Sequence, residues 1–316
     1  MVATLQRIIH YISGLWFIDY CDISQNIHNM EEQVDQPVAE IQEFCPSCGA
    51  KRKGDYCRKC GEKRIIPERD FSIRKFLNQT LWHYAHFDSK LLKSIWLLFS
   101  KPGFLTAEWI AGRRVGYMKP IQMFLVASVL FYFFLPTTTA HFTGPWDMIE
   151  GYKKHDHFQN IFQYDFEKAF AEKAAQYNVS EEQLAKEFVA LAAVRSKTWL
   201  FVLIPVWGAC IFLFFRRKIP WLVPHLVFAM HALTFYILLD LSVHPVLHLL
   251  GFENAGKYIF LFLMLSFPVY QALAVHRVYG SSWPLTIVKT VGIDACFILL
   301  ILMYRQIVTI SVVAML

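Results

Sequence analysis

Long apolar runs recur along the chain from residue 121 to its end, separated by polar connections of which one, 137–198, is long. About 20 helical residues cross the hydrocarbon core of a bilayer, and the runs reach or approach that length. They predict membrane-spanning helices at residues 121–135, 199–215, 221–241, 258–275 and 285–303. The pattern therefore indicates an all-α multi-pass membrane protein with about five transmembrane helices.

Two other regions have a helical pattern without the length of a span. Residues 71–96 mix apolar and basic positions, which suits helices lying along the membrane interface, and Pro102-Gly103 ends this pattern. Residues 158–194 place Phe and Leu at helical spacing among alternating charges. This segment predicts a helical hairpin that turns near Asn178, with Ser180 as the N-cap of its second helix.

The composition agrees with a membrane protein, because 55% of the residues are hydrophobic and only 18% are charged. The formal net charge is +6, and most basic residues lie between Lys51 and Lys119, directly before the first apolar run. We expect such a segment to bind anionic lipid headgroups at the adjacent membrane surface, and no nucleic acid is expected as a partner.

The placement of Lys and Arg also predicts the orientation. The positive-inside rule puts the basic residues before the first span, and the connection 216–218, in the cytoplasm. The loop 137–198 and the C-terminus are then extracytoplasmic. Arg305 opposes this assignment, unless the last helix is longer, tilted or re-entrant.

Four cysteines near the N-terminus form two Cys-x-x-Cys-Gly sequences, with eight residues between Cys48 and Cys57. Paired turns of this kind supply four thiolates for a tetrahedral metal site, and glycine allows the backbone conformation that follows each second cysteine. A complete set of four cysteines leaves no open position, so we expect a structural zinc ion, with rubredoxin-like iron or a redox dithiol as weaker alternatives. The expected ligands are Cys45, Cys48, Cys57 and Cys60.

These observations divide the chain into six parts. The first is an N-terminal extension, interfacial or disordered, in which Met30 is an alternative start of the reading frame. It is followed by a cytoplasmic zinc ribbon and by a segment of interfacial helices that ends in a juxtamembrane turn. The last three parts are the first transmembrane helix, an extracytoplasmic helical loop and the remaining transmembrane helices. Their expected ranges are 1–43, 44–66, 67–118, 119–136, 137–198 and 199–316.

Two sets of polar residues are candidate sites besides the cysteines. Arg113, Arg114 and Lys119 are candidates for binding an anion or a lipid headgroup, although ordinary positive-inside anchoring explains them more simply. Ionisable residues within the apolar runs are functional candidates because each is costly to insert, and packed structural histidines are the favoured alternative. This candidate intramembrane polar site comprises His225, His231, Asp240, His244, His248 and Asp294.

The chain resembles a family of uncharacterised bacterial membrane proteins that join an N-terminal Cys₄ zinc ribbon to a multi-helix membrane region. The resemblance covers residues 44–305 and implies this architecture without implying an activity. It is carried by the two cysteine turns and by Lys101-Pro102-Gly103, the segments 109–114 and 117–121, Pro224-His225 and His231.

No enzymatic activity is assigned from the sequence, and the expectation leans towards none. We expect a non-enzymatic role in interaction, assembly or sensing, with a protein partner docked at the zinc ribbon. A small-solute or ion transporter that uses intramembrane Asp and His residues is one alternative. A membrane-embedded enzyme acting on lipid is another, although the chain shows no nucleophile elbow, phosphate-binding glycine loop or HExxH motif.

Overall fold

The computed structural model describes residues 44–73, 90–134, 166–249 and 255–316. The predictions for residues 1–43 and for much of the segments 71–96 and 137–198 lie outside these ranges. Contacts within the chain define two compact units. The first contains the described residues up to Ile65 together with Ala111–Val115, and the second contains Ile66–Ile110 and Gly116–Leu316.

The second unit is helical, and isolated bridges are the only β-structure among the described residues. This confirms the predicted all-α class for the described part of the chain. Its helices are α2 (Pro67–Asp70), α4 (Lys90–Ser100), α5 (Phe104–Ile110), α6 (Pro120–Phe134), α9 (Phe166–Tyr177), α10 (Glu181–Phe215), α11 (Leu222–Leu249), α12 (Ala255–Tyr279) and α13 (Trp283–Val313).

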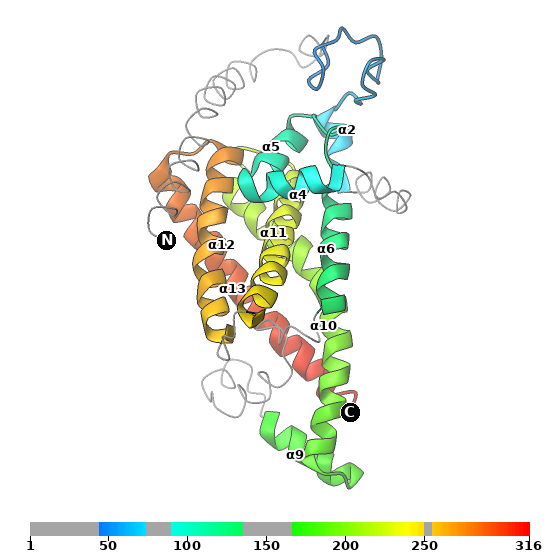
Figure 1. Ribbon diagram of the computed structural model, residues 1–316, viewed down its shortest axis with the longest axis vertical. Helices are drawn as coiled ribbons and strands as arrows, with labels where there is room; N and C mark the ends of the chain where they lie inside the picture. The colour runs from blue at the N-terminus through cyan, green and yellow to red at the C-terminus, as the bar shows by residue number, and fades with distance from the viewer. Residues whose placement is uncertain (1–43, 74–89, 135–165, 250–254) are drawn as a thin grey trace. The chain divides into compact units, whose positions relative to one another are not determined.

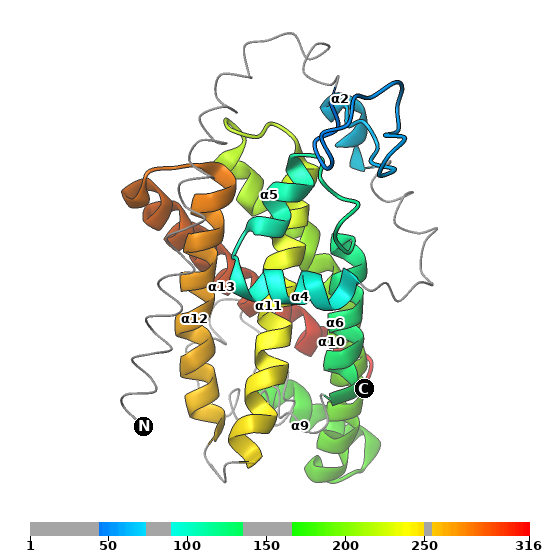
Figure 2. The same ribbon diagram turned by 45° about the horizontal axis from the view of Figure 1, so that its top comes forward.

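Helix α11 is the centre of this unit and packs against α6, α10 and α12 (Figures 1 and 2). Its residues from Val223 to Leu238 are almost all buried, which explains why they are apolar on every side. Helix α13 packs on α10 and α12. Aromatic stacking joins the elements, for example Phe235 of α11 on Tyr270 of α12, with ring centroids 3.7 Å apart.

The predicted break at Pro102-Gly103 separates α4 from α5. Gly103 has φ of +77°, and a Cβ atom there would lie 2.7 Å from the backbone oxygen of Ala274 in α12. Both facts require glycine. The Arg277 side chain of α12 donates a 2.6 Å hydrogen bond to the Pro102 carbonyl oxygen. The turn therefore contacts α12 in two ways, by the close packing of Gly103 on Ala274 and by this hydrogen bond.

The predicted hairpin is confirmed by α9 and α10, which are joined through Asn178 in a left-handed conformation at φ of +52°. The Ser180 hydroxyl accepts from the backbone N–H of Gln183, and the Gln183 side chain accepts from the Ser180 N–H, forming a capping box. Phe170 and Phe188 then pack with the C-terminal part of α13 in one hydrophobic cluster. Helix α10 continues through residue 198, where the sequence predicted a boundary between loop and span.

By length and composition, two helical segments among the described residues can cross a membrane, Leu222–Val243 and Trp283–Val313. The segments Pro120–Phe131 and Phe201–Phe215 are apolar but shorter. The central segment of α11 is largely buried by other helices, as the core helix of a soluble protein also is. Arg305 lies within the single continuous helix α13, whose 31 residues extend about 46 Å and so exceed one perpendicular crossing.

Candidate metal centre

The first cysteine turn is closed by its own backbone. The Gly49 N–H donates to the Cys45 carbonyl oxygen at 2.8 Å, and the Cys45 N–H donates to the Ala50 oxygen at 2.9 Å. Gly49 has φ of +69°, the left-handed conformation that glycine adopts most readily. The second turn repeats this arrangement with Cys57, Gly61 and Glu62. One antiparallel bridge flanks each turn, Phe44 with Lys51 and Tyr56 with Lys63.

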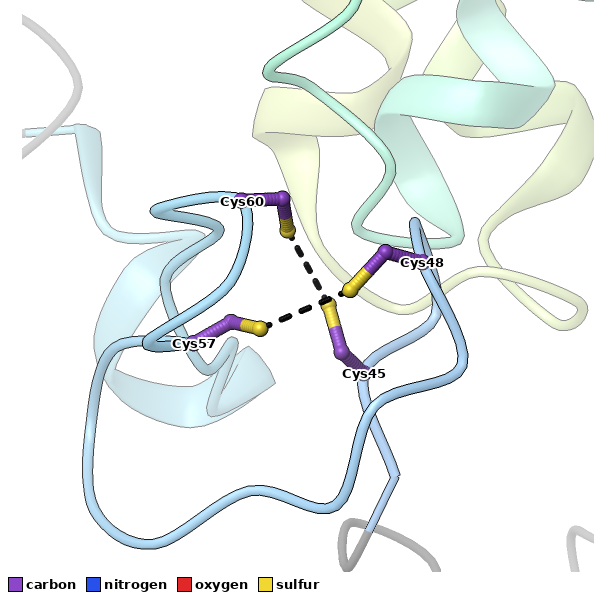
Figure 3. Close-up of side chains that lie close together, drawn as sticks. All are labelled: Cys45, Cys48, Cys57 and Cys60. Atoms are coloured by element: carbon purple, nitrogen blue, oxygen red, sulfur yellow. Dashed lines mark hydrogen bonds between the residues drawn. The ribbon is translucent and has the colours of Figure 1, made fainter.

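The two turns bring the four cysteine sulfur atoms together, all within 4.8 Å of one another (Figure 3). The Sγ atoms of Cys45 and Cys60 are 3.5 Å apart, as are those of Cys48 and Cys57. A tetrahedral zinc ion with bonds of about 2.3 Å requires sulfur atoms about 3.8 Å apart. The four thiols therefore fit a metal ion, and the sequence prediction that these residues converge is confirmed.

The thiols influence one another electrostatically. Burial alone raises the pKa of Cys45, but the N–H groups of Ser47 and Cys48 and the Arg52 side chain lower it to about 6. The Glu62 N–H lowers the pKa of Cys60, yet burial and hydrogen bonds with the other thiols outweigh it and raise this pKa to about 12. Four adjacent thiolates are thus unfavourable by themselves, and a bound cation would remove their mutual repulsion.

Glu62 connects the cysteine turns to a distant segment of the same unit. Its side chain is only 3% exposed. One oxygen, Oε2, accepts from the Ser47 hydroxyl at 2.7 Å and from the backbone N–H groups of Arg114 at 2.9 Å and Val115 at 3.0 Å. Gly112 lies in this segment with φ of +82°, and a Cβ atom there would lie 3.2 Å from the Ile65 side chain. The segment 111–115 is therefore part of the metal unit, whereas the sequence placed it in the juxtamembrane part of 67–118.

The three basic residues predicted to bind an anion are not brought together within one described unit. Arg113 and Arg114 belong to the cysteine unit, and Lys119 belongs to the helical unit just before α6. Their joint role in binding a lipid headgroup stays a prediction.

His225 and His231 make separate contacts within the helical unit. His225 Nε2 lies 3.1 Å from the Ile219 carbonyl oxygen, which can only accept, so Nε2 donates and Nδ1, 2.8 Å from the Tyr279 hydroxyl oxygen, accepts in the neutral ring. His231 is buried, and its Nδ1 is 2.8 Å from the Thr106 hydroxyl oxygen of α5. Each ring thus joins α11 to another segment.

Asp240 is also buried on α11, and Asp294 lies on α13. The Gln271 amide of α12 donates to the carboxylate of Asp294, which connects α12 to α13. The side chains of His244 and His248 lie outside the described residues, so a shared site with Asp240 stays a prediction.

Sequence reasoning did not single out Glu62, Thr106 or Gln271. Glu62 directly follows the second Cys-x-x-Cys-Gly sequence, and this position is the one available signal for its role. Thr106 and Gln271 gain their roles from partners on other helices, which no local pattern indicates.

Comparison with known families gives one match, to a protein of unknown function (DUF3667), over residues 88–132. This stretch contains α4, α5 and most of α6 and begins after the four cysteines. No curated protein and no solved structure matches the chain. The match supports the predicted resemblance to proteins of unknown function for residues 88–132 and adds nothing about activity.

Proposed function

We propose that this protein is a multi-pass membrane protein of the bacterial inner membrane with a structural zinc unit, and that it acts by binding a partner rather than by catalysis. The observation that carries the proposal is the convergence of four cysteine thiols from two short turns. Four protein ligands complete a tetrahedral zinc site and leave no position for water or substrate. Cys45, Cys48, Cys57 and Cys60 would hold the ion, whose charge offsets that of the thiolates.

The metal is proposed to stabilise the unit itself. Its described residues form two turns with isolated bridges and no longer element of β-structure, so they cannot enclose a large apolar core. A structural zinc ion contributes on the order of 10 kcal/mol to folding such a unit. A stabilised exposed unit is suited to docking a protein partner.

Insertion of the helical unit into a membrane is supported by apolar residues on its outside. Leu213 of α10, Leu265 of α12 and Val291 of α13 are each more than 60% exposed. Exposed apolar residues repeated over several helices are typical of a lipid-facing surface. We propose about five spans, because α6, the C-terminal part of α10 and α12 accompany the two helices of sufficient length.

Zinc content tests the metal assignment. The purified full-length protein is expected to contain about one zinc ion per chain, and a Cys48→Ser, Cys57→Ser double variant is expected to lose it while still fractionating with membranes. The matched control is Cys210→Ser, Cys296→Ser, which changes two free cysteines of the helical unit and should retain zinc. Stoichiometric zinc in the first variant, or recovery of the protein without detergent, would contradict the proposal.

Partner binding needs a separate experiment. Native complexes are purified from the wild type and from the two double variants, and protein, lipid and metal are analysed in the same sample. We expect a protein partner to be lost only with the zinc ion. An unchanged set of copurifying proteins in the zinc-free variant would contradict docking at this unit.

The orientation is tested by single cysteines in a background without reactive thiols. Asp55→Cys is expected to resist an impermeant thiol reagent in intact cells, and Asn160→Cys is expected to react. The opposite result would invert the proposed topology.

Transport is a second candidate, favoured by the polar contact between α12 and α13. The Gln271 side chain is buried, and its Oε1 has no hydrogen-bond partner among the described residues, while its amide holds Asp294. An ionisable residue such as Asp294 within membrane helices is a candidate for an ion or proton pathway. Loss of ion flux in proteoliposomes on Asp294→Asn, with normal insertion, would support this candidate.

A further inference from the structure

A group of basic side chains gathers at one end of the helical unit, near His225, whose Nε2 lies 3.1 Å from the carbonyl oxygen of Ile219. Arg217 and Lys218 follow the end of α10, and Lys289 lies in the second turn of α13. Lys289 lies over the ring of Phe215, the last residue of α10, which places it near Arg217 and Lys218. Such a cluster attracts an anion unless nearby carboxylates neutralise it.

The described contacts of these residues do not neutralise them. The Lys289 Nζ lies 4.4 Å from the centroid of the Phe215 ring, and this ring stacks on Tyr279 at 3.7 Å. The Lys218 Nζ donates to the carbonyl oxygens of Tyr279 at 2.7 Å and of Gly280 at 3.1 Å, at the end of α12. Among the described residues these partners are a ring and backbone carbonyls, so none of them compensates the positive charge of either ammonium group.

The nearest carboxylate along α13 is that of Asp294. It lies five positions after Lys289, about 140° around the helix, and bonds with Gln271. Arg217 is exposed and free to approach a ligand.

The surroundings of Lys289 indicate which anion fits. It lies six residues, about 9 Å along the helix, beyond the half-exposed Trp283. The adjacent Val288 is 69% exposed, and Leu285, one helical turn earlier on the same face of α13 as Lys289, is 45% exposed. A free phosphate ion would leave these apolar side chains uncovered, whereas a phospholipid would cover them with its acyl chains.

We propose that Arg217, Lys218 and Lys289 bind the phosphate of an anionic phospholipid whose acyl chains lie along the exposed apolar side chains of α13. Guanidinium and ammonium groups are the usual ligands of phosphate, and basic pockets between membrane helices bind such headgroups. This inference rests on the proposed membrane insertion of the helical unit.

The test compares lipid binding by the full-length protein in nanodiscs of phosphatidylcholine and of phosphatidylcholine with phosphatidylglycerol. Phosphatidylglycerol is expected to raise the melting temperature of the wild type and to remain bound in native mass spectrometry. Lys289→Gln should weaken retention of this lipid about fivefold, the effect of one basic residue near an anionic headgroup. Arg217→Gln provides a second variant at an exposed position, where misfolding is not expected.

Lys173→Gln is the matched control, because Lys173 of α9 also lies over an aromatic ring, 5.8 Å from the centroid of Tyr177. It should retain phosphatidylglycerol like the wild type. Unchanged retention by both Lys289→Gln and Arg217→Gln would overturn the proposed site. An equal rise in melting temperature with inorganic phosphate in phosphatidylcholine nanodiscs would overturn a lipid as the ligand. Recovery of the protein without detergent would instead overturn membrane insertion itself.

Discussion

The Glu62 carboxylate accepts a 2.9 Å hydrogen bond from the backbone N–H of Arg114, a residue 52 positions later in the chain. The same oxygen also accepts from Ser47, next to the first cysteine pair. A single buried side chain therefore fixes both a metal-binding turn and the segment 111–115. Hydrogen bonds to a buried carboxylate contribute about 1.5–3 kcal/mol each, so this contact organises the unit.

Replacing Glu62 is expected to loosen the metal unit without removing a ligand. Glu62→Ala leaves three donors without their acceptor, and the affinity for zinc should fall about 10–100-fold, as for other residues that support metal ligands. Transfer of zinc to a competing chelator should become correspondingly faster. The measurement is the rate of colour development with a zinc-binding dye. Glu68→Ala, at an exposed glutamate six residues later, should release zinc at the wild-type rate; equal rates in the two variants would refute the role of Glu62.

Removal of the metal should affect one unit and spare the other. A strong chelator is expected to make the segment 45–65 accessible to protease, because the unit depends on the ion for its folding. The far-UV circular dichroism of the detergent-solubilised protein should change little, since the helices belong to the other unit. A large loss of helical signal would show that the helical unit also depends on the metal.

Gly103→Ala is expected to destabilise the helical unit by about 2–4 kcal/mol. The added Cβ atom would meet the Ala274 backbone at 2.7 Å, and φ of +77° is unfavourable for alanine. Thermal unfolding in detergent measures the change. Gly116→Ala is the control, because its nearest neighbour is the Lys93 Nζ at 4.0 Å and its φ is not in the left-handed region. Similar melting temperatures for both variants would contradict the close approach of α12.

Thr106→Val is expected to cost about 1–3 kcal/mol, because it removes the hydroxyl that pairs with the buried Nδ1 of His231. His231→Leu should cost a similar amount. In the double variant neither polar group remains, so the total cost should be smaller than the sum of the two. If the two losses of stability were additive, Thr106 and His231 would have no interaction energy, which would contradict this contact between α5 and α11.

Two substitutions of Asp294 separate a structural from a functional role. Asp294→Asn keeps an oxygen that can accept from the Gln271 amide, so the melting temperature should stay near that of the wild type. Asp294→Leu removes the acceptor and should lower the free energy of unfolding by about 1–3 kcal/mol. Equal stability of the two variants would contradict a structural contribution of the bond. If the carboxylate carries a charge-dependent function, Asp294→Asn should lose that function while remaining stable.

Local features of the sequence were sufficient wherever the cause of the structure is local. The spacing of the four cysteines and the following glycines predicts two turns with converging sulfur atoms, because each turn is closed by bonds within six residues. Ser180 and Gln183 predict the start of α10 for the same reason. Pro102-Gly103 ends α4 because the constraint lies in the backbone of these residues.

Other features depend on partners far away in the chain, and only the tertiary structure decides them. The sequence of segment 111–115 indicates a basic juxtamembrane turn. In the structure, however, two of its backbone N–H groups donate hydrogen bonds to the Glu62 carboxylate. His231 becomes the partner of Thr106 through the packing of α5 on α11, 125 positions apart in sequence. Lys289 lies over the Phe215 ring, near Arg217 and Lys218, because α13 packs on α10. Hydrophobic patterning specifies which residues are helical and apolar, whereas it is the packing of one helix on another that selects the partner of each polar side chain.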